Sequence, residues 1–105
     1  MKKITLNIVI SFGLLLSNSA MAHTPLCSCY DFGDGTILCE GGFSDGSSAS
    51  GVDMSVLDVS GKELLKGKIN EDGEFEFQKP SVDYKVQFNA GPGHTIEIDG
   101  KNIVE

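Results

Sequence analysis

Residues 74–88 read EFEFQKPSVDYKVQF, and this stretch decides the fold class. Apolar residues alternate with polar ones on both sides of Pro80, at Phe75, Phe77, Tyr84, Val86 and Phe88. Alternation at every second position is typical of β-strands that bury one face. Because proline has no N–H to give to a sheet ladder, Pro80 marks the break between two strands.

The same pattern extends toward the N-terminus. Residues 52–59 alternate and then change phase at Leu57, which indicates a β-bulge or a strand that twists between faces. A Ser-Gly turn at 60–61 is followed by residues 64–69, which we expect to form the returning strand. Residues 70–73 (NEDG) predict a hairpin turn, because Asp-Gly tolerates the positive φ of tight turns.

The pattern also extends toward the C-terminus, where Ile96 and Ile98 alternate after the AGPG bend at 90–93. Six or seven short strands with turn signals between them, and no amphipathic helix, predict an all-β fold. We expect a small antiparallel sandwich with an Ig-like architecture. A cysteine- and glycine-rich segment, residues 23–51, precedes it, and we expect this segment to be mostly loop with one short strand at 36–40.

Residues 1–22 have the features of a secretory signal peptide. Two lysines are followed by a mainly apolar stretch and by the small-residue motif AMA, which predicts cleavage after Ala22. The expected organisation is a signal peptide (1–22), the cysteine-rich segment (23–51) and a β-sandwich domain (52–105) that folds as one unit with that segment. The expected location is periplasmic or secreted.

Two other roles of the N-terminal stretch are less favoured. An uncleaved anchor helix would need about 20 apolar residues, and this stretch is shorter and broken by polar residues. A lipid anchor at Cys27 would need its motif directly after the apolar stretch, but three residues intervene after Ala22 and before that motif. We therefore expect no membrane span after signal cleavage.

The charge of the exported part limits its partners. Residues 23–105 contain six lysines, no arginine and all fifteen acidic residues, which gives a formal charge of −9. Binding of nucleic acid needs a basic patch, so the composition argues against nucleic acid and against anionic membranes. An acidic surface is compatible with attraction of metal cations, although solubility explains it equally well.

Part of the chain resembles a known family, the prealbumin-like carboxypeptidase-regulatory β-sandwich, in four runs: 56–64, 67–69, 72–77 and 84–86. The following AGPGH at 90–94 is similar to a segment in periplasmic domains associated with nickel and cobalt uptake systems. The resemblance covers roughly residues 52–98 and leaves the cysteine-rich segment outside. It implies a sandwich fold, but a shared sandwich does not carry an activity with it.

The candidate metal ligands are the histidines and cysteines of residues 23–105, namely His23, Cys27, Cys29, Cys39 and His94. If cleavage follows Ala22, the α-amino and imidazole nitrogens of His23 chelate one ion together, which suits Cu(II) or Ni(II). A Cys-x-Cys pair on an extended segment directs both thiols to one side, where Cu(I) or Zn(II) accept thiolates. We therefore expect nickel, copper or zinc as the bound ion.

The cysteines also allow a structural explanation. Exported proteins normally use cysteines in disulfides, and an odd number leaves at least one thiol free, paired between chains or bound to something else. A disulfide from Cys27 or Cys29 to Cys39 would staple the glycine-rich segment and contribute roughly 3 kcal/mol. A redox-active thiol is the third alternative.

Other site types find less support in the sequence. Asp31, Asp34 and Asp45 lie among glycines, but their spacing does not match an EF-hand, and short Asp-Gly turns explain them more economically than calcium. A glycine- and serine-rich run at 41–48 lacks the Lys and the following helix of a phosphate-binding loop. No activating base is placed beside a cysteine nucleophile, so we expect no enzyme.

The expected function is that of a periplasmic transition-metal-binding protein for uptake, delivery or tolerance. Its expected partner is a metal transporter or another envelope protein. The alternative function is that of an extracytoplasmic β-sandwich interaction module with a structural disulfide. The number of free thiols in the native protein distinguishes the two, because metal–thiolate ligation and disulfide formation use the same sulfurs.

Overall fold

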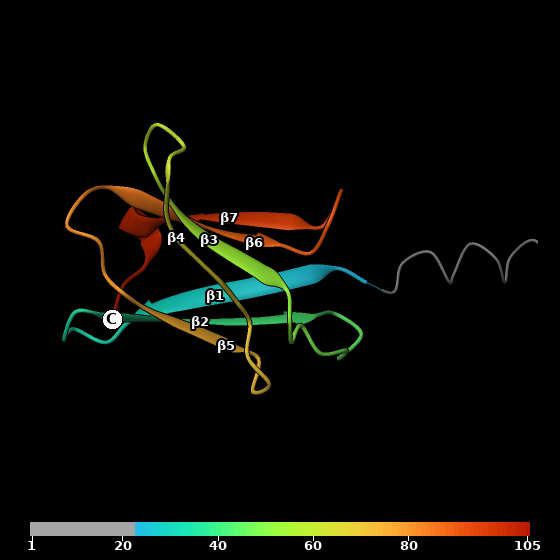
Figure 1. The fold of residues 1–105 in the computed structure, drawn as a ribbon. Coiled ribbons are helices and arrows are strands. Elements are labelled where there is room, and N and C mark those ends of the chain that lie inside the picture. The colour runs from blue at the N-terminus through green and yellow to red at the C-terminus, as the bar shows by residue number, and fades with distance from the viewer. Residues whose placement is uncertain (1–22) are drawn as a thin grey trace, which may run out of the picture.

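The computed structural model describes residues 23–105 and contains seven β-strands in two antiparallel sheets (Figure 1). The strands are β1 (Pro25–Asp31), β2 (Thr36–Phe43), β3 (Asp53–Asp58), β4 (Glu63–Lys68), β5 (Glu74–Gln78), β6 (Tyr84–Asn89) and β7 (Thr95–Asp99). A short 3-10 helix, η3 (Gly100–Asn102), follows β7. The prediction of a small antiparallel sandwich of six or seven strands is confirmed.

The two sheets differ in size and in strand order. The three-stranded sheet has the order β1-β2-β5, and the four-stranded sheet has the order β4-β3-β6-β7. Their facing sides enclose the core, whose largest fully buried side chains are Phe88, Ile37, Met54, Ile69, Val56, Val86 and Cys39. The alternation in the sequence places these residues on the inner faces, because neighbouring side chains of a strand point to opposite sides.

Glycines allow the two sheets to approach each other closely. A Cβ at Gly41 of β2 would lie 2.6 Å from the Phe88 ring of the opposite sheet. In the other direction, a Cβ at Gly67 of β4 would overlap the Phe75 ring of β5. Each sheet therefore receives an aromatic ring from the other at a position without a side chain.

The prediction that residues 23–51 are mostly loop is wrong. This segment forms two of the seven strands, β1 and β2, which pair over their whole length from Pro25↔Phe43 to Asp31↔Ile37. The small and polar residues of β1 conceal a regular alternation of partly buried and exposed positions. Pairing with β2 gives them a strand conformation that their own propensity does not favour.

Two predictions about turns have different outcomes. The expected change of phase at Leu57 is confirmed, because the register of β3 against β4 shifts between Val56 and Leu57. Residues 70–73 do form a turn, in which Gly73 has a φ of 82° and the Asn70 side chain accepts from two backbone N–H groups. This turn is not a hairpin, however, because β4 and β5 belong to different sheets.

The predicted signal peptide, residues 1–22, lies outside the described residues. Within residues 23–105, no helix has the length and apolar character to cross a membrane.

Candidate functional site

A disulfide joins the two strands of the N-terminal hairpin. Cys29 of β1 and Cys39 of β2 are directly opposite each other in the register and are bonded to one another, with 4.0 Å between their Cα atoms. The prediction of a structural disulfide is confirmed, and the pairing is Cys29–Cys39. Because these sulfurs are bonded to each other, neither is available as a thiolate ligand in this state.

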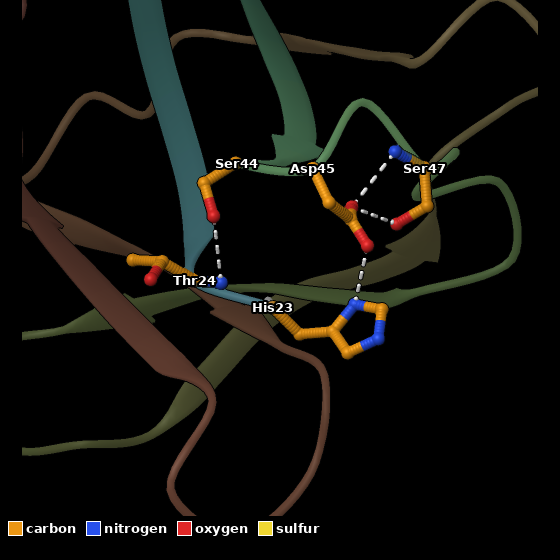
Figure 2. Close-up of polar contacts among 5 residues, drawn as sticks. All are labelled: His23, Thr24, Ser44, Asp45 and Ser47. Carbon is orange, nitrogen blue, oxygen red and sulfur yellow. Dashed lines mark hydrogen bonds and ion pairs between the residues drawn. The ribbon is translucent and has the colours of Figure 1, made fainter. Parts of the chain in front are cut away.

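The disulfide and the β1–β2 register also bring His23 close to Asp45. The register continues beyond Pro25↔Phe43, since Ser44 N–H donates to the Thr24 carbonyl at 2.9 Å and Thr24 N–H donates to Ser44 Oγ at 3.1 Å. One further step in each strand places His23 across from Asp45, as Figure 2 shows. The start of the described segment is thus held against the loop that follows β2.

The imidazole of His23 is directly paired with a carboxylate. Its Nδ1 lies 2.8 Å from Asp45 Oδ2, and the two side chains are 64% and 28% exposed (Figure 2). The ring also meets Phe43 edge to face, with 6.4 Å between ring centroids. The imidazole is therefore oriented from two sides while most of it stays open to solvent.

Asp45 is itself held in place by its neighbours. Its Oδ1 accepts from the hydroxyl of Ser47 at 2.6 Å and from the backbone N–H of Ser47 at 2.9 Å (Figure 2). These hydrogen bonds, followed by the charge of His23, hold the pKa of the Asp45 carboxyl below its ordinary value. The carboxylate stays charged at neutral pH, with Oδ2 directed at the imidazole.

Cys27 is the one cysteine of residues 23–105 that is not in a disulfide. It lies on the same face of β1 as Cys29 and is partly buried against the core. Burial raises the pKa of its thiol from 9.0 to about 11. The thiol is thus protonated at neutral pH, which makes it a weak nucleophile and a poor metal ligand unless it loses its proton.

His94 occupies the turn between β6 and β7. Its Nδ1 lies 3.1 Å from the Pro92 carbonyl, and its own carbonyl accepts from Ala90 N–H. Because a carbonyl oxygen only accepts, Nδ1 is the donor in this contact, and a metal ion would have to approach the ring at Nε2. No contact joins His94 to the other four predicted ligands among the described residues.

The five predicted ligands do not form one cluster. Within the described part of the chain, no group of three or more His, Cys, Asp or Glu side chains is arranged to hold a metal. Cys29 and Cys39 are in the disulfide, Cys27 is partly buried, and His23 is paired with Asp45 alone. The metal prediction therefore reduces to the His23–Asp45 pair.

The other aspartates of the N-terminal segment have structural roles. Asp31 Oδ1 accepts from Gly33 N–H at 2.8 Å, and Asp34 Oδ1 accepts from Thr36 N–H at 3.0 Å. Both arrangements are the Asp turns that the spacing favours over a calcium loop.

The hollows of the surface lie elsewhere. One hollow, of about 710 Å³, is open and lies between residues 50–53 and the β6–β7 turn. Two smaller ones, of about 360 and 310 Å³, lie beside Tyr84. None of these three hollows is lined by a predicted ligand.

Sequence reasoning missed Asp45 as a partner of His23 and assigned it only to a turn. The information was present in the spacing of the cysteines. If Cys29 faces Cys39 in an antiparallel pair, every residue of β1 is matched, and His23 falls opposite Asp45. This inference requires knowing whether Cys27 or Cys29 is bonded to Cys39, and the sequence alone does not decide between them.

Neither a protein-family model, nor a curated protein, nor a solved structure matches this chain. The geometry of the site is therefore the basis for assigning a function.

Proposed function

We propose that this protein is an exported transition-metal-binding protein whose ion, Cu(II) or Ni(II), is held at its mature N-terminus. The ligands are the α-amino nitrogen and imidazole Nδ1 of His23 and the carboxylate of Asp45. Nitrogen-rich sites with a carboxylate suit these two ions, whereas structural zinc is commonly held by thiolates. The proposed role is uptake, delivery or tolerance of the ion in the periplasm or outside the cell.

The observation that carries this proposal is the His23–Asp45 contact. Two ligands that each lie about 2.0–2.1 Å from one ion, at a right angle, are about 2.9 Å apart. The Nδ1–Oδ2 distance is 2.8 Å, so the two atoms already have the separation of adjacent ligands. The α-amino group of His23 would complete a chelate with Nδ1 if the signal peptide is removed after Ala22.

Hydrogen bonds from a neighbouring residue support Asp45 as a ligand. The hydrogen bonds of Ser47 use Oδ1 and leave Oδ2 for the ion. Outer contacts of this kind orient a ligating carboxylate before the metal binds. His94, with its free Nε2, stays a predicted further ligand.

A competition titration against a chromophoric chelator tests the proposal, with the exported protein and Cu(II) or Ni(II). His23→Ala, or one glycine added before His23, should weaken binding at least about tenfold, and Asp45→Asn should weaken it about tenfold. Asp34→Asn is the matched control, since it makes the same change in a turn aspartate without a histidine partner. Unchanged affinity in the first three variants would contradict the proposal.

A second candidate function is that of an interaction module with a structural disulfide. The observation that favours it is the Cys29–Cys39 bond, which uses two sulfurs expected to bind metal and fixes a hairpin at the edge of a sheet. This role predicts that a peptide partner still binds after the protein is treated with EDTA. Loss of all partner binding on chelation would instead favour a role that depends on the metal.

A further inference from the structure

The backbone of β1 has one side that faces away from β2. At both ends of the hairpin the even-numbered residues bond to β2: Phe32 N–H donates to Thr36 at 3.0 Å, and the Thr24 carbonyl accepts from Ser44. In an antiparallel pair the bonded positions alternate along each strand. The N–H and C=O groups of Cys27 and Cys29 therefore point to the open edge.

No strand among the described residues pairs with this edge over its central part, although β7 of the other sheet lies close to β1. Asp31, which has the same phase as Cys27 and Cys29, donates its N–H to the Val104 carbonyl at 3.1 Å. Figure 1 accordingly places the C-terminal tail beside the end of β1. β1 pairs with β2 alone, so the N–H groups of Cys27 and Cys29 have no ladder partner on this side among residues 23–105. The outer edge of β1 thus already makes a backbone hydrogen bond to the C-terminal tail at Asp31, whereas it has no paired strand at Cys27 and Cys29.

β1 also lacks the charges that protect the other edges. The remaining edge strands carry charged side chains along their length, namely Lys66 and Lys68 on β4, Glu74 and Glu76 on β5, and Glu97 and Asp99 on β7. Residues 25–30 of β1 carry no charge. Charged side chains on an edge strand prevent another chain from pairing with it. β1 is therefore the edge at which a further strand meets the least resistance.

The outer face beside this edge indicates the chemistry of the partner. Leu26 and Tyr30 are 51% and 44% exposed, and Ser28 lies between them on the same face. Ser28 of β1 lies opposite Glu40 of β2, and Glu40 in turn lies opposite Glu74 of β5. The two glutamates therefore place like charges directly opposite each other on neighbouring strands. Like charges in this position repel, and none of the ion pairs of the described residues involves either glutamate.

A strand added to β1 would lie about 4.8 Å beyond it. If the added strand has a Lys or Arg opposite Ser28, the long side chain of that residue would extend over the small Ser28 side chain toward Glu40. Apolar residues two positions away on either side would cover Leu26 and Tyr30. A second copy of residues 23–105 would bring another formal charge of −9, so charge complementarity favours a basic partner over self-pairing.

We propose that the edge of β1 at Cys27 and Cys29 is the docking site for an extended segment of a partner protein, with a central Lys or Arg flanked by apolar residues. The segment adds as a fourth strand to the three-stranded sheet, and main-chain hydrogen bonds supply much of its affinity. This inference rests on the interaction role and is independent of metal binding.

The test uses the disulfide-bonded protein and the probe acetyl-Lys-Leu-Val-Lys-Val-Leu-Lys-amide, with binding followed by NMR. Without probe, the Cys27 and Cys29 amides should exchange rapidly with solvent while the Ser28 amide is protected by β2. With probe, exchange at Cys27 and Cys29 should slow at least about tenfold. A probe with a central Glu in place of Lys should bind more weakly.

Two variants at one position isolate the backbone donor. Cys27→Pro removes the open N–H without removing a bond to β2, and Pro25 already has the same phase in this strand. Cys27→Val keeps the N–H and removes only the thiol. Cys27→Pro should weaken probe binding at least about tenfold relative to Cys27→Val. The exchange pattern of the unmodified chain provides the same test if Cys27→Pro does not fold.

Each contrary result has a separate meaning. Probe binding that protects other amides, or is unchanged in Cys27→Pro, overturns the β1 site and leaves the interaction role standing. Absence of binding by the unmodified protein contradicts both. Protection of Cys27 and Cys29 without probe, rising with protein concentration together with dimer formation, overturns the basic partner and identifies a second copy as the occupant.

Discussion

The two sheets of this sandwich are stabilised in different ways. The four-stranded sheet contributes Met54, Val56, Val86 and Phe88, all fully buried, and is held without a covalent link. The three-stranded sheet contains the disulfide, and the His23–Asp45 pair lies just beyond the open end of its β1–β2 hairpin. We infer from this comparison that the four-stranded sheet is the scaffold and that the proposed binding features lie on and beside the three-stranded sheet.

The charges of the strands follow the same division. Lysines occur on β4 and β6 of the four-stranded sheet, whereas β1, β2 and β5 contain none. The strands of the three-stranded sheet thus carry acidic and apolar side chains but no basic ones. An acidic surface of this kind attracts cations, whether a metal ion or a basic peptide.

Removal of the disulfide is the strongest way to break this comparison. Closure of a loop with a sequence separation of 10 contributes about 3 kcal/mol to the free energy of unfolding. A Cys29→Ser, Cys39→Ser double variant should therefore lose about 10–20 °C in Tm by calorimetry. Cys27→Ser is the control and should change Tm little. Equal Tm values for all three proteins would show that the disulfide does not stabilise the hairpin.

The reactivity of Cys27 sharpens the comparison. A pKa of about 11 instead of 9.0 leaves about one hundredth of the usual thiolate near neutral pH. Alkylation of Cys27 by iodoacetamide should therefore be about 100-fold slower in the folded protein than in the protein unfolded in urea without reductant. Equal rates would mean that this thiol is exposed and available as a ligand.

The close approach of the sheets is tested at a pair of adjacent glycines. Gly41→Ala places a Cβ 2.6 Å from the Phe88 ring and should destabilise the protein by about 1–3 kcal/mol in urea unfolding. Gly42→Ala is the matched control, because nothing lies within 4 Å of its added Cβ. If both variants lose the same stability, the cost comes from the strand backbone and not from contact between the sheets.

The smallest expected effect concerns pH. The hydrogen bond from Lys79, then that from Gly33, lowers the pKa of the Asp31 carboxyl. Its contribution to stability is therefore complete above the unfolded pKa of about 3.9 and is lost as the pH falls through the folded value. Urea midpoints should be level between about pH 5 and 8 and fall below about pH 4. Asp31→Asn and Lys79→Met should both flatten this fall, and an unchanged profile would contradict the assignment.

The C-terminal half of the fold could be predicted from the sequence because its strands carry large apolar residues at alternate positions. Phe75, Phe77, Val86 and Phe88 each indicate both a strand and the face that it buries. The hairpin turn at 70–73 was the exception, because local turn chemistry does not specify whether the two flanking strands share a sheet.

The N-terminal half could not be predicted in the same way. Residues 25–31 read PLCSCYD, in which small and polar residues mask the alternation. Their strand conformation and the His23–Asp45 contact depend on pairing across 6–22 residues of sequence. Such pairing becomes predictable only when the disulfide partner is known, and an odd number of cysteines left it undecided.

Native and denaturing mass spectrometry of the protein expressed with its predicted signal peptide, with alkylation before and after unfolding, tests the central claim most directly. The account predicts a chain that begins at His23, one bound copper or nickel ion in the native spectrum, and a single cysteine that is alkylated after unfolding without reductant. The fraction of the native chain that carries the ion should fall in Asp45→Asn, in line with its about tenfold weaker binding. A metal-free chain, or three alkylated cysteines without reductant, would contradict it.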